Sequence, residues 1–307
     1  MSTIQTTISD GYYEPGLISE ALARWDDYIE LPLENPTEEE VEAVDRILAA
    51  VLQGLESPPL GWHRLIYSRW AVHCMLRQYD GSEAKTAKMA APQLACHCEL
   101  IERLKSNEAQ LSDETKRAFL HAVGAYFFGM DRINVNVVYW RTMLTNTYAL
   151  EQSVGPEVMG LCFDYYTLWF WDARYREALK NGRHCRVLNI IDTANQDFAS
   201  IKRNWLGLAT LGRWMKTFPG KSPGPIDGIR YTLVRNFPPV LKMMTRFFQA
   251  MLPAGTFDRV RFFTPREEAA YREALAELVP LDQVPRSMLG GSDEHFALDG
   301  GLDRPLY

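Results

Sequence analysis

The chain has 307 residues, of which 47% are apolar, enough to bury a substantial core in one domain with an addition or in two domains. A wholly disordered or fibrous protein is therefore excluded. Lys and Arg number 33 against 39 Asp and Glu, so the formal net charge is −6. This mildly acidic balance lacks the electrostatic footprint of a general nucleic-acid binder, and we expect no nucleic-acid partner.

The cysteines, five in number, form no regular framework in this long chain. An odd, unframed set of this kind predicts reduced thiols and not a disulfide scaffold. No apolar run approaches the roughly 18 residues that a membrane span needs, and no secretory signal pattern opens the chain. We therefore expect a cytoplasmic protein.

The N-terminal third is predicted to be helical. Residues 1–36 mix aromatic side chains with Gly and Pro and are expected to form an irregular arm. A capping box of Thr37 and Glu40 then begins a helix that ends at Gly54. Further helical patterns cover residues 62–79, 82–105 and 113–126. Residues 37–125 are thus interpreted as a helical N-terminal lobe.

After Gly129 the pattern changes to an alternation of strands and helices. The β-rich runs are 133–140, 186–191, 229–235 and 259–263. The helical runs that separate or follow them are 156–180, 200–217, 239–252 and 264–278. Alternation of this kind predicts crossover connections, a mostly parallel sheet and an α/β fold. The final residues, 292–307, are expected to form a tail.

The helix predicted within residues 236–252 is strongly amphipathic. Pro238 and Pro239 preset its start, and Pro253 ends it. Its apolar stripe consists of Val240, Met243, Met244, Phe247, Phe248, Met251 and Leu252. Two interpretations stay open: an ordinary surface helix that packs on the sheet, or the wall of a site for varied apolar ligands, which flexible thioethers and aromatic edges suit.

This helix belongs to an ordered series of short motifs. Asn236-Phe237-Pro238 precedes it, and Thr256 with Arg259-Val260 follows it at the start of a strand. The other motifs are Tyr79-Asp80 with Ala84-Lys85, Gly129-Met130-Asp131, Ile190-Ile191-Asp192, and Pro285 with Gly290-Gly291. The series resembles the CRAL-TRIO lipid-binding family, whose pattern is Asn-Ala-Pro, a gate helix and a Thr-x-x-Lys-Ile strand start. The resemblance spans about residues 60–291.

The resemblance implies a site for a lipid headgroup. In phosphatidylinositol-binding members a Glu pairs with the Lys and joins the Thr, and the corresponding residues here are Asp227, Thr256 and Arg259. A second alignment places the disturbed motif Phe218-Pro219-Gly220 at the Glu position, and that motif carries no carboxylate. Arg is a good bidentate phosphate ligand in its own right. The alternative interpretation of the three residues is a strand-edge salt bridge and a helix-end hydroxyl.

What the resemblance implies for the whole chain is a lipid-binding and lipid-transfer protein. Residues 126–291 would form the CRAL-TRIO-like domain, whose sheet floors an apolar cavity and whose helix 239–252 acts as a movable gate. We expect one bound lipid, with a phosphoinositide as the candidate class, and no other cofactor, no metal and no catalytic residue. The expected protein is a monomer that associates transiently with membrane surfaces.

Two other classes of function stay open. The chain could be an enzyme on the same α/β scaffold, with Asp192 at a strand end as its acid. It could also be an interaction module whose apolar groove receives a partner helix. Gly220-Lys221-Ser222 imitates a phosphate-binding loop, but no strand precedes it. Cys96-His97-Cys98 imitates a metal site, but residues one and two apart on a helix point away from one another.

Overall fold

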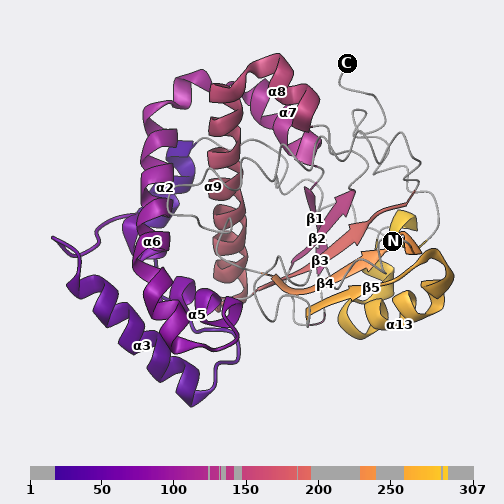
Figure 1. Ribbon diagram of the computed structural model, residues 1–307, viewed down its shortest axis with the longest axis horizontal. Helices are drawn as coiled ribbons and strands as arrows, with labels where there is room; N and C mark the ends of the chain where they lie inside the picture. The colour runs from indigo at the N-terminus through magenta and orange to yellow at the C-terminus, as the bar shows by residue number, and fades with distance from the viewer. Residues whose placement is uncertain are drawn as a thin grey trace.

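The computed structural model describes residues 18–123, 125–130, 132, 136–141, 147–184, 186–194, 229–239, 259–284 and 286–289. Figure 1 shows a group of helices on one side of the molecule and the sheet, with helix α13 (Glu268–Leu278) beside it, on the other. The long helix α9 (Pro156–Asn181) lies between the sheet and the lobe helices α2 (Ile18–Asp26) and α6 (Glu83–Ser106).

The helical lobe contains α-helices that together carry most of the buried side chains. These helices are α2 (Ile18–Asp26), α3 (Glu38–Gln53), α4 (His63–Ile66), α5 (Arg69–Gln78), α6 (Glu83–Ser106), α7 (Asp113–Val123), α8 (Thr147–Val154) and α9 (Pro156–Asn181), with the 3-10 turn η1 (Glu108–Gln110). The capping box predicted at Thr37 and Glu40 is confirmed, because each residue's side chain accepts the other's backbone N–H. The helix predicted over 62–79 is divided at Ser68, whose hydroxyl caps α5.

The prediction of an irregular arm over residues 1–36 is wrong for residues 18–26, which form α2. Ile18, Ala21, Leu22 and Trp25 recur at helical spacing and are buried on one face of α2. The neighbouring Gly and Pro residues obscured this short period in the sequence. Beyond α2, residues 28–36 form an extended strap that runs to α3, and this strap contacts both the end of α9 and the sheet.

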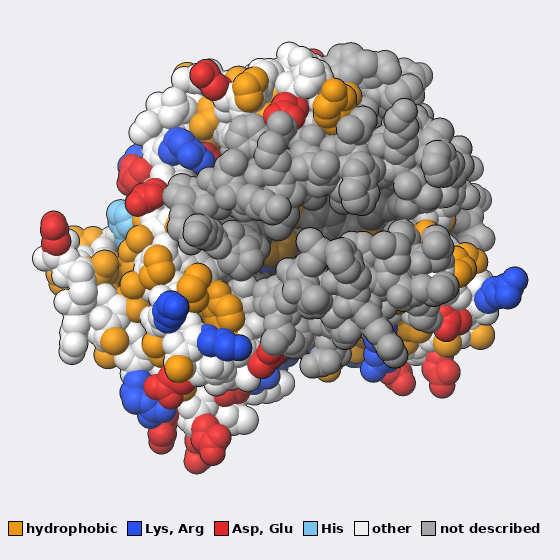
Figure 2. Space-filling model, in the orientation of Figure 1, with side chains coloured by type: hydrophobic (Ala, Val, Ile, Leu, Met, Phe, Trp, Pro, Cys, Tyr) orange, Lys and Arg blue, Asp and Glu red, His pale blue; other side chains and the backbone are white. Residues whose placement is uncertain are grey.

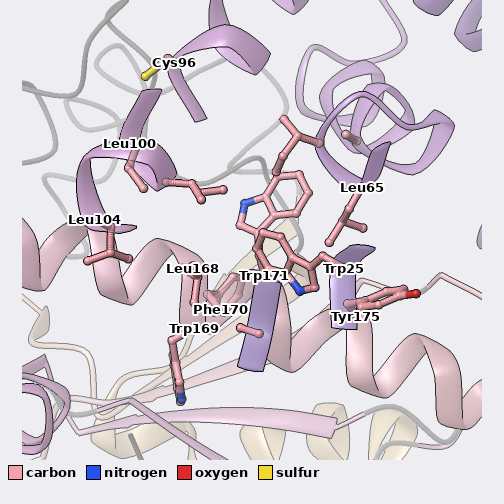
Figure 3. Close-up of a cluster of buried hydrophobic side chains, with 14 of the residues drawn as sticks. Trp25, Leu65, Cys96, Leu100, Leu104, Leu168, Trp169, Phe170, Trp171 and Tyr175 are labelled. Atoms are coloured by element: carbon pink, nitrogen blue, oxygen red, sulfur yellow. The ribbon is translucent and has the colours of Figure 1, made fainter. Parts of the chain in front are cut away.

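The lobe core surrounds α9, which is buried on almost every side. Figure 3 shows Trp25, Leu168 and Trp171 meeting among side chains from α2, α4, α6 and α9. The buried Asp172 carboxylate accepts bonds from the Trp25 indole at 3.1 Å and from the Arg24 guanidinium at 2.8 Å. The buried Asp172 carboxylate therefore has partners from another helix, as burial of a charge requires.

The sheet has the order β1-β2-β3-β4-β5 among the described strands. The strands are β1 (Ala125–Met130), β2 (Asn136–Arg141), β3 (Val187–Asp192), β4 (Ile229–Arg235) and β5 (Val260–Phe262). β1 is antiparallel to β2, and the pairs β2–β3, β3–β4 and β4–β5 are parallel. The predicted fold class, a helical lobe followed by a mostly parallel sheet flanked by helices, is confirmed.

Two of the sequence predictions near β1 and β2 need correction. The helix expected to reach residue 126 ends at Val123, and residues 125–130 form a strand that the sequence did not predict. Gly129 and Met130 of the motif therefore lie within β1 and not ahead of the first strand. The aromatic run that follows α7 suits a strand as well as a helix, and only pairing with β2 decides between them.

One face of the sheet is covered by α13 (Glu268–Leu278). Tyr271 and Leu275 of this helix pack against Leu188, Ile190 and Leu233 in a small aliphatic core. A 3-10 turn, η5 (Pro265–Glu267), leads into the helix, and η6 (Leu281–Gln283) and η7 (Arg286–Leu289) follow it. In the described part of the chain, no helix combines the length and apolar character needed to cross a membrane.

Candidate functional site

Most residues of the expected lipid site lie outside the described residues. This applies to the stripe of the gate helix, namely Val240, Met243, Met244, Phe247, Phe248 and Met251. It applies equally to Asp227 and Thr256 of the headgroup set, to the predicted helix 200–217 and to the tail 292–307. Arg259 is described, and so are the strands that would floor the cavity.

The face of the sheet opposite α13 is directed towards the helical lobe. Successive side chains of a strand point to opposite faces, so Val187, Asn189 and Ile191 share this face on β3, while Leu188 and Ile190 pack with α13. Val187 belongs to the same core as α9. Figure 1 shows α9 and the sheet on either side of this region.

A polar pair interrupts this apolar face near its middle. Asn189 of β3 and Thr232 of β4 are opposite one another in the parallel register. Both side chains are buried, at 5% and 8% exposure. Buried amides and hydroxyls normally have hydrogen-bond partners, and within an apolar site they fix the orientation of a ligand. The described part of this sheet face is thus apolar apart from the central Asn189–Thr232 pair.

The amino ends of the three last parallel strands each carry an arginine. Arg186 precedes β3, Arg230 is the second residue of β4, and Arg259 precedes β5. We call these three residues the basic edge. The Glu34 carboxylate, on the strap, accepts from the Arg186 backbone N–H at 3.0 Å and from its Nε at 3.2 Å, and lies 3.6 Å from the Arg230 guanidinium. The strap therefore joins the basic edge to the lobe.

The expected headgroup residue Arg259 is also in contact with the lobe. Its Nη2 donates to the backbone carbonyl of Arg77 at 3.1 Å, at the end of α5. The Arg77 guanidinium in turn donates to the carbonyl of Asn35 on the strap and forms an ion pair with Glu40. The half-buried Arg259 is thus held where β5, α5 and the strap meet. The sequence indicated Arg259, but it gave no sign of these lobe partners.

His73 lies in the same polar region and is uncharged at neutral pH. Burial lowers its pKa to about 4, and the Arg77 guanidinium contributes in the same direction. The Glu40 carboxylate, 4.0 Å from Nε2, opposes this shift without overcoming it. At neutral pH the local charge therefore comes from the arginines and glutamates.

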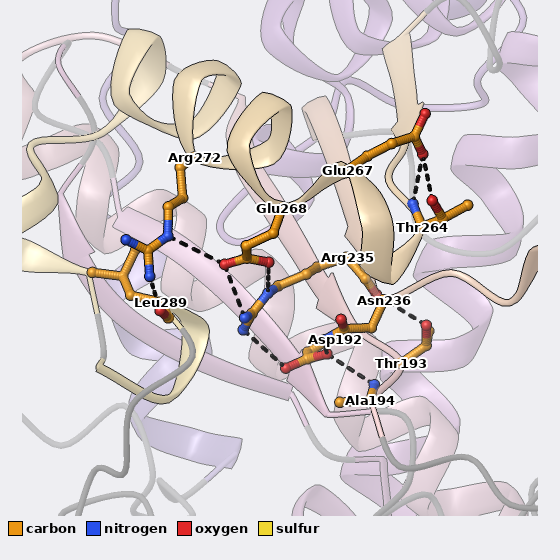
Figure 4. Close-up of polar contacts among 10 residues, drawn as sticks. All are labelled: Asp192, Thr193, Ala194, Arg235, Asn236, Thr264, Glu267, Glu268, Arg272 and Leu289. Atoms are coloured by element: carbon orange, nitrogen blue, oxygen red, sulfur yellow. Dashed lines mark hydrogen bonds and ion pairs between the residues drawn. The ribbon is translucent and has the colours of Figure 1, made fainter.

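The carboxyl ends of β3 and β4 hold a second polar network, which Figure 4 shows. Asp192 Oδ1 accepts from the Ala194 backbone N–H at 2.9 Å and from the Asn236 amide at 2.8 Å, while Oδ2 lies 3.6 Å from Arg235. Arg235 also pairs with Glu268 of α13 at 3.0 Å. Asn236 has a φ of +56°, a left-handed conformation that Asn tolerates well.

This second network bears on the proposal that Asp192 is a catalytic acid. Both of its oxygens face donors that join β3, β4 and the chain leaving β4. Asp192 thereby sets the direction in which the chain continues towards the predicted gate helix. The motif Ile190-Ile191-Asp192 has a structural use here: two strand residues are followed by a carboxylate that caps the strand end.

The cysteine and histidine cluster of α6 has the properties of a buried core. Burial raises the pKa of the Cys96 thiol to about 11 and that of Cys98 to about 12, and it lowers the pKa of His97 to about 4. Metal ligation requires thiolates, which these shifts disfavour. The described ranges contain no group of three or more His, Cys, Asp or Glu side chains placed to hold a metal ion.

The comparisons with known proteins show a likeness to solved structures. No family model and no curated protein matches the chain. Among solved structures, the crystal structure of Sfh5 is similar over 85% of this chain and 90% of that chain, with 12% sequence identity and a TM-score of 0.48. Sfh5 is a Sec14-family CRAL-TRIO protein. At these values the likeness concerns the fold and carries no functional conclusion.

Proposed function

We propose that the chain binds a single lipid or other small hydrophobic molecule between its sheet and its helical lobe, and transfers or presents it between membranes. The observation that carries the proposal is the sheet face opposite α13, which is apolar apart from the Asn189–Thr232 pair. The ordered motifs, with Asn236 following β4 and Arg259 opening β5, add the resemblance to lipid-binding proteins.

The lipid headgroup is placed by this proposal at the amino ends of β4 and β5. Arg259 would give a charge-assisted bond to a phosphate oxygen, Thr256 a hydroxyl, and Asp227 would hold the guanidinium. A phosphoinositide is the ligand class that fits this set. Arg259 Nη2 donates to the Arg77 carbonyl, which places the guanidinium where β5 meets the end of α5.

The transfer step follows from the solvation of acyl chains. Each buried CH₂ gains about 0.8 kcal/mol on leaving water, so a protein site competes with a bilayer only when it shields most of the chain. The helix 239–252 would supply that shield. At a membrane its Met and Phe stripe would be solvated by lipid, which stabilises the open state where exchange is useful. We propose no covalent step and no cofactor besides the lipid.

Native mass spectrometry of the purified protein tests this function directly. We expect a bound mass that organic extraction identifies as a lipid. Phe247→Asp should abolish uptake because a charge within an apolar site is expensive, whereas the matched control Leu60→Asp, at a side chain 76% exposed, should retain it. A wild-type protein that carries no lipid and takes none from vesicles would show that the stripe is ordinary core.

The headgroup assignment has its own test. Arg259→Glu should lose phosphatidylinositol transfer while keeping transfer of neutral apolar ligands, because the acyl site is untouched. Thr256→Val offers a second variant without the Arg77 contact, in case the first unfolds. Unchanged phosphatidylinositol transfer in both folded variants would remove Arg259 and Thr256 from the headgroup site.

A further inference from the structure

The core of the helical lobe contains a set of buried nitrogen atoms that have no hydrogen-bond partner among the residues that the structure describes. They are Nε1 of Trp70, Nε1 of Trp171 and both ring nitrogens of His97. These side chains are 2%, 1% and 3% exposed, so bulk solvent does not reach the atoms. Buried polar groups nearly always have a partner, because an unpaired one costs free energy. The set therefore indicates a further bound group.

The three side chains meet at one place, where α5, α6 and α9 pack together. Trp171 of α9 is their common neighbour: its ring centroid lies 5.5 Å from that of His97 and 5.0 Å from that of Trp70. The two indoles are arranged edge to face, and the imidazole is tilted by 58° to the Trp171 ring. The nitrogens without partners thus belong to adjoining rings from three different helices.

The atoms are also complementary in kind. An indole nitrogen carries a hydrogen and can only donate, whereas a neutral imidazole has one N–H and one nitrogen that accepts. His97 is neutral at pH 7, because burial lowers its pKa to about 4. Two donors therefore adjoin an acceptor without forming a direct bond to it. A small molecule that both accepts and donates would satisfy all three groups.

Other polar groups of the lobe have direct partners or reach solvent. Within the core, the Trp25 indole donates to Asp172 at 3.1 Å, and Nε2 of His184 lies 3.3 Å from the Tyr28 hydroxyl. On the outside, Figure 2 shows basic and acidic side chains next to one another at the lower left, where Figure 1 has α3. The nitrogens around Trp171 have neither kind of compensation from the described residues.

We propose that a water molecule is bound at this place in the lobe core, accepts hydrogen bonds from the Trp70 and Trp171 indoles, and donates one to His97. Three hydrogen bonds are typical of a buried water. The centroid separations of 5.0 and 5.5 Å are close to the span of two hydrogen bonds of about 2.9 Å through one oxygen. An ion fits this set poorly, because the surrounding core side chains are apolar.

The water joins α5, α6 and α9 by directional contacts. Apolar side chains tolerate small sliding movements, whereas a hydrogen-bonded network favours a single arrangement of the helices that supply it. The site lies within the lobe and requires no lipid. The proposal therefore stands or falls separately from the proposed function.

Magnetic relaxation dispersion of the water signal tests the proposal, because it counts water molecules that stay inside a protein. His97→Leu should lose one long-lived water relative to wild type, since an apolar group replaces the acceptor. The matched control His63→Leu, at a half-buried side chain on α4, should keep the wild-type number. Circular dichroism checks that both variants are folded. An unchanged number of long-lived waters in folded His97→Leu would overturn the proposal.

Nuclear Overhauser cross-peaks between water and the indole protons test the site in the unaltered protein. The indole protons of Trp70 and Trp171 should each show such a cross-peak, whereas that of Trp25, which is bonded to Asp172, should show none. Trp70→Phe and Trp171→Phe assign the two signals. Upfield-shifted protons without a water cross-peak would place each N–H over a neighbouring ring, a weak contact that needs no water, and the proposal would be wrong.

Mass spectrometry of the supernatant after denaturation distinguishes water from another ligand. Water leaves no trace in the fraction released from the protein. A small organic molecule released in amounts equal to the protein, and missing from His97→Leu, would assign the site to that molecule and refute the water.

Discussion

The core of the helical lobe and the core between the sheet and α13 bury different kinds of side chain. Around α9 the lobe buries indoles and imidazoles, with Trp70 stacked on His184 and His97 beside Trp171. The sheet core is mainly aliphatic, with Tyr271, Phe263 and Met288 as its other side chains. Because indoles and imidazoles are directional and imidazoles titrate, the stability of the lobe core should depend on side-chain geometry and on pH. The stability of the sheet core should depend mainly on how well its side chains fill the available volume.

The largest expected effect is the loss of the central indole of the lobe. Trp171 is 1% exposed and contacts Trp25, Trp70 and His97. Trp171→Ala should lower the free energy of unfolding by about 4 kcal/mol, because it removes a large apolar surface and leaves a cavity. Urea unfolding followed by circular dichroism measures the loss, and a change below about 1 kcal/mol would show that the core refills the space.

Acid should weaken the lobe selectively. Burial lowers the pKa of His97 to about 4 and, with Arg174, that of His184 to about 3, against an ordinary value of 6.5. A depressed histidine pKa means that the unfolded chain binds protons first, so the stability is complete above pH 6.5 and is lost as pH falls towards 4. For His97 alone the loss is on the order of 3 kcal/mol. Unfolding free energies measured from pH 7.5 to 4.5 should fall, and His97→Leu should flatten the curve.

The sheet core provides the contrasting substitution. Leu275 is fully buried between α13 and the sheet, so Leu275→Ala should cost about 2 to 3 kcal/mol. Since the buried histidines among the described residues are His73, His97 and His184, all outside this core, the same loss should be found at pH 7.5 and at pH 5. In Trp171→Ala, by contrast, water admitted beside His97 should reduce the pH dependence. An equal pH response in the two variants would contradict the distinction between the cores.

The smallest expected effect concerns a helix end outside both cores. Thr37→Ala removes the hydroxyl that accepts the Glu40 N–H and should destabilise the protein by about 1 kcal/mol. Thr37→Ser retains the hydroxyl and serves as the matched control. The two variants are compared by their urea midpoints at constant slope.

Features with local causes could be predicted from the sequence. The β4 strand occupies 229–235 as predicted, because a β-rich run is bounded there by breakers. The Thr37 capping box is set by residues three apart. The motif of Arg259 predicted that this residue lies at the start of a strand, and in the structure it directly precedes β5.

Features that depend on distant partners could not be predicted. Glu34 contacts Arg186 across 152 positions, and nothing in the strap's Pro-rich sequence indicates that contact. The Arg77 carbonyl that holds Arg259 is a backbone group, which no motif records. Residues 125–130 became a strand because β2 was available to pair with them. In each case the deciding partner is brought close only by the fold.

The sequential order of the strands has a consequence for synthesis. Because spatial order follows chain order from β1 to β5, each new strand can add to the edge of a sheet already made as the chain leaves the ribosome. The lobe cannot be completed in the same way. Trp25 and its partner Asp172 are 147 positions apart in the sequence. Glu34 is separated by still more residues from its partners Arg186 and Arg230. The amino-terminal helices must therefore remain partly unpacked until α9 and the first parallel strands have emerged, so the beginning of the chain is among the last parts to reach its final packing.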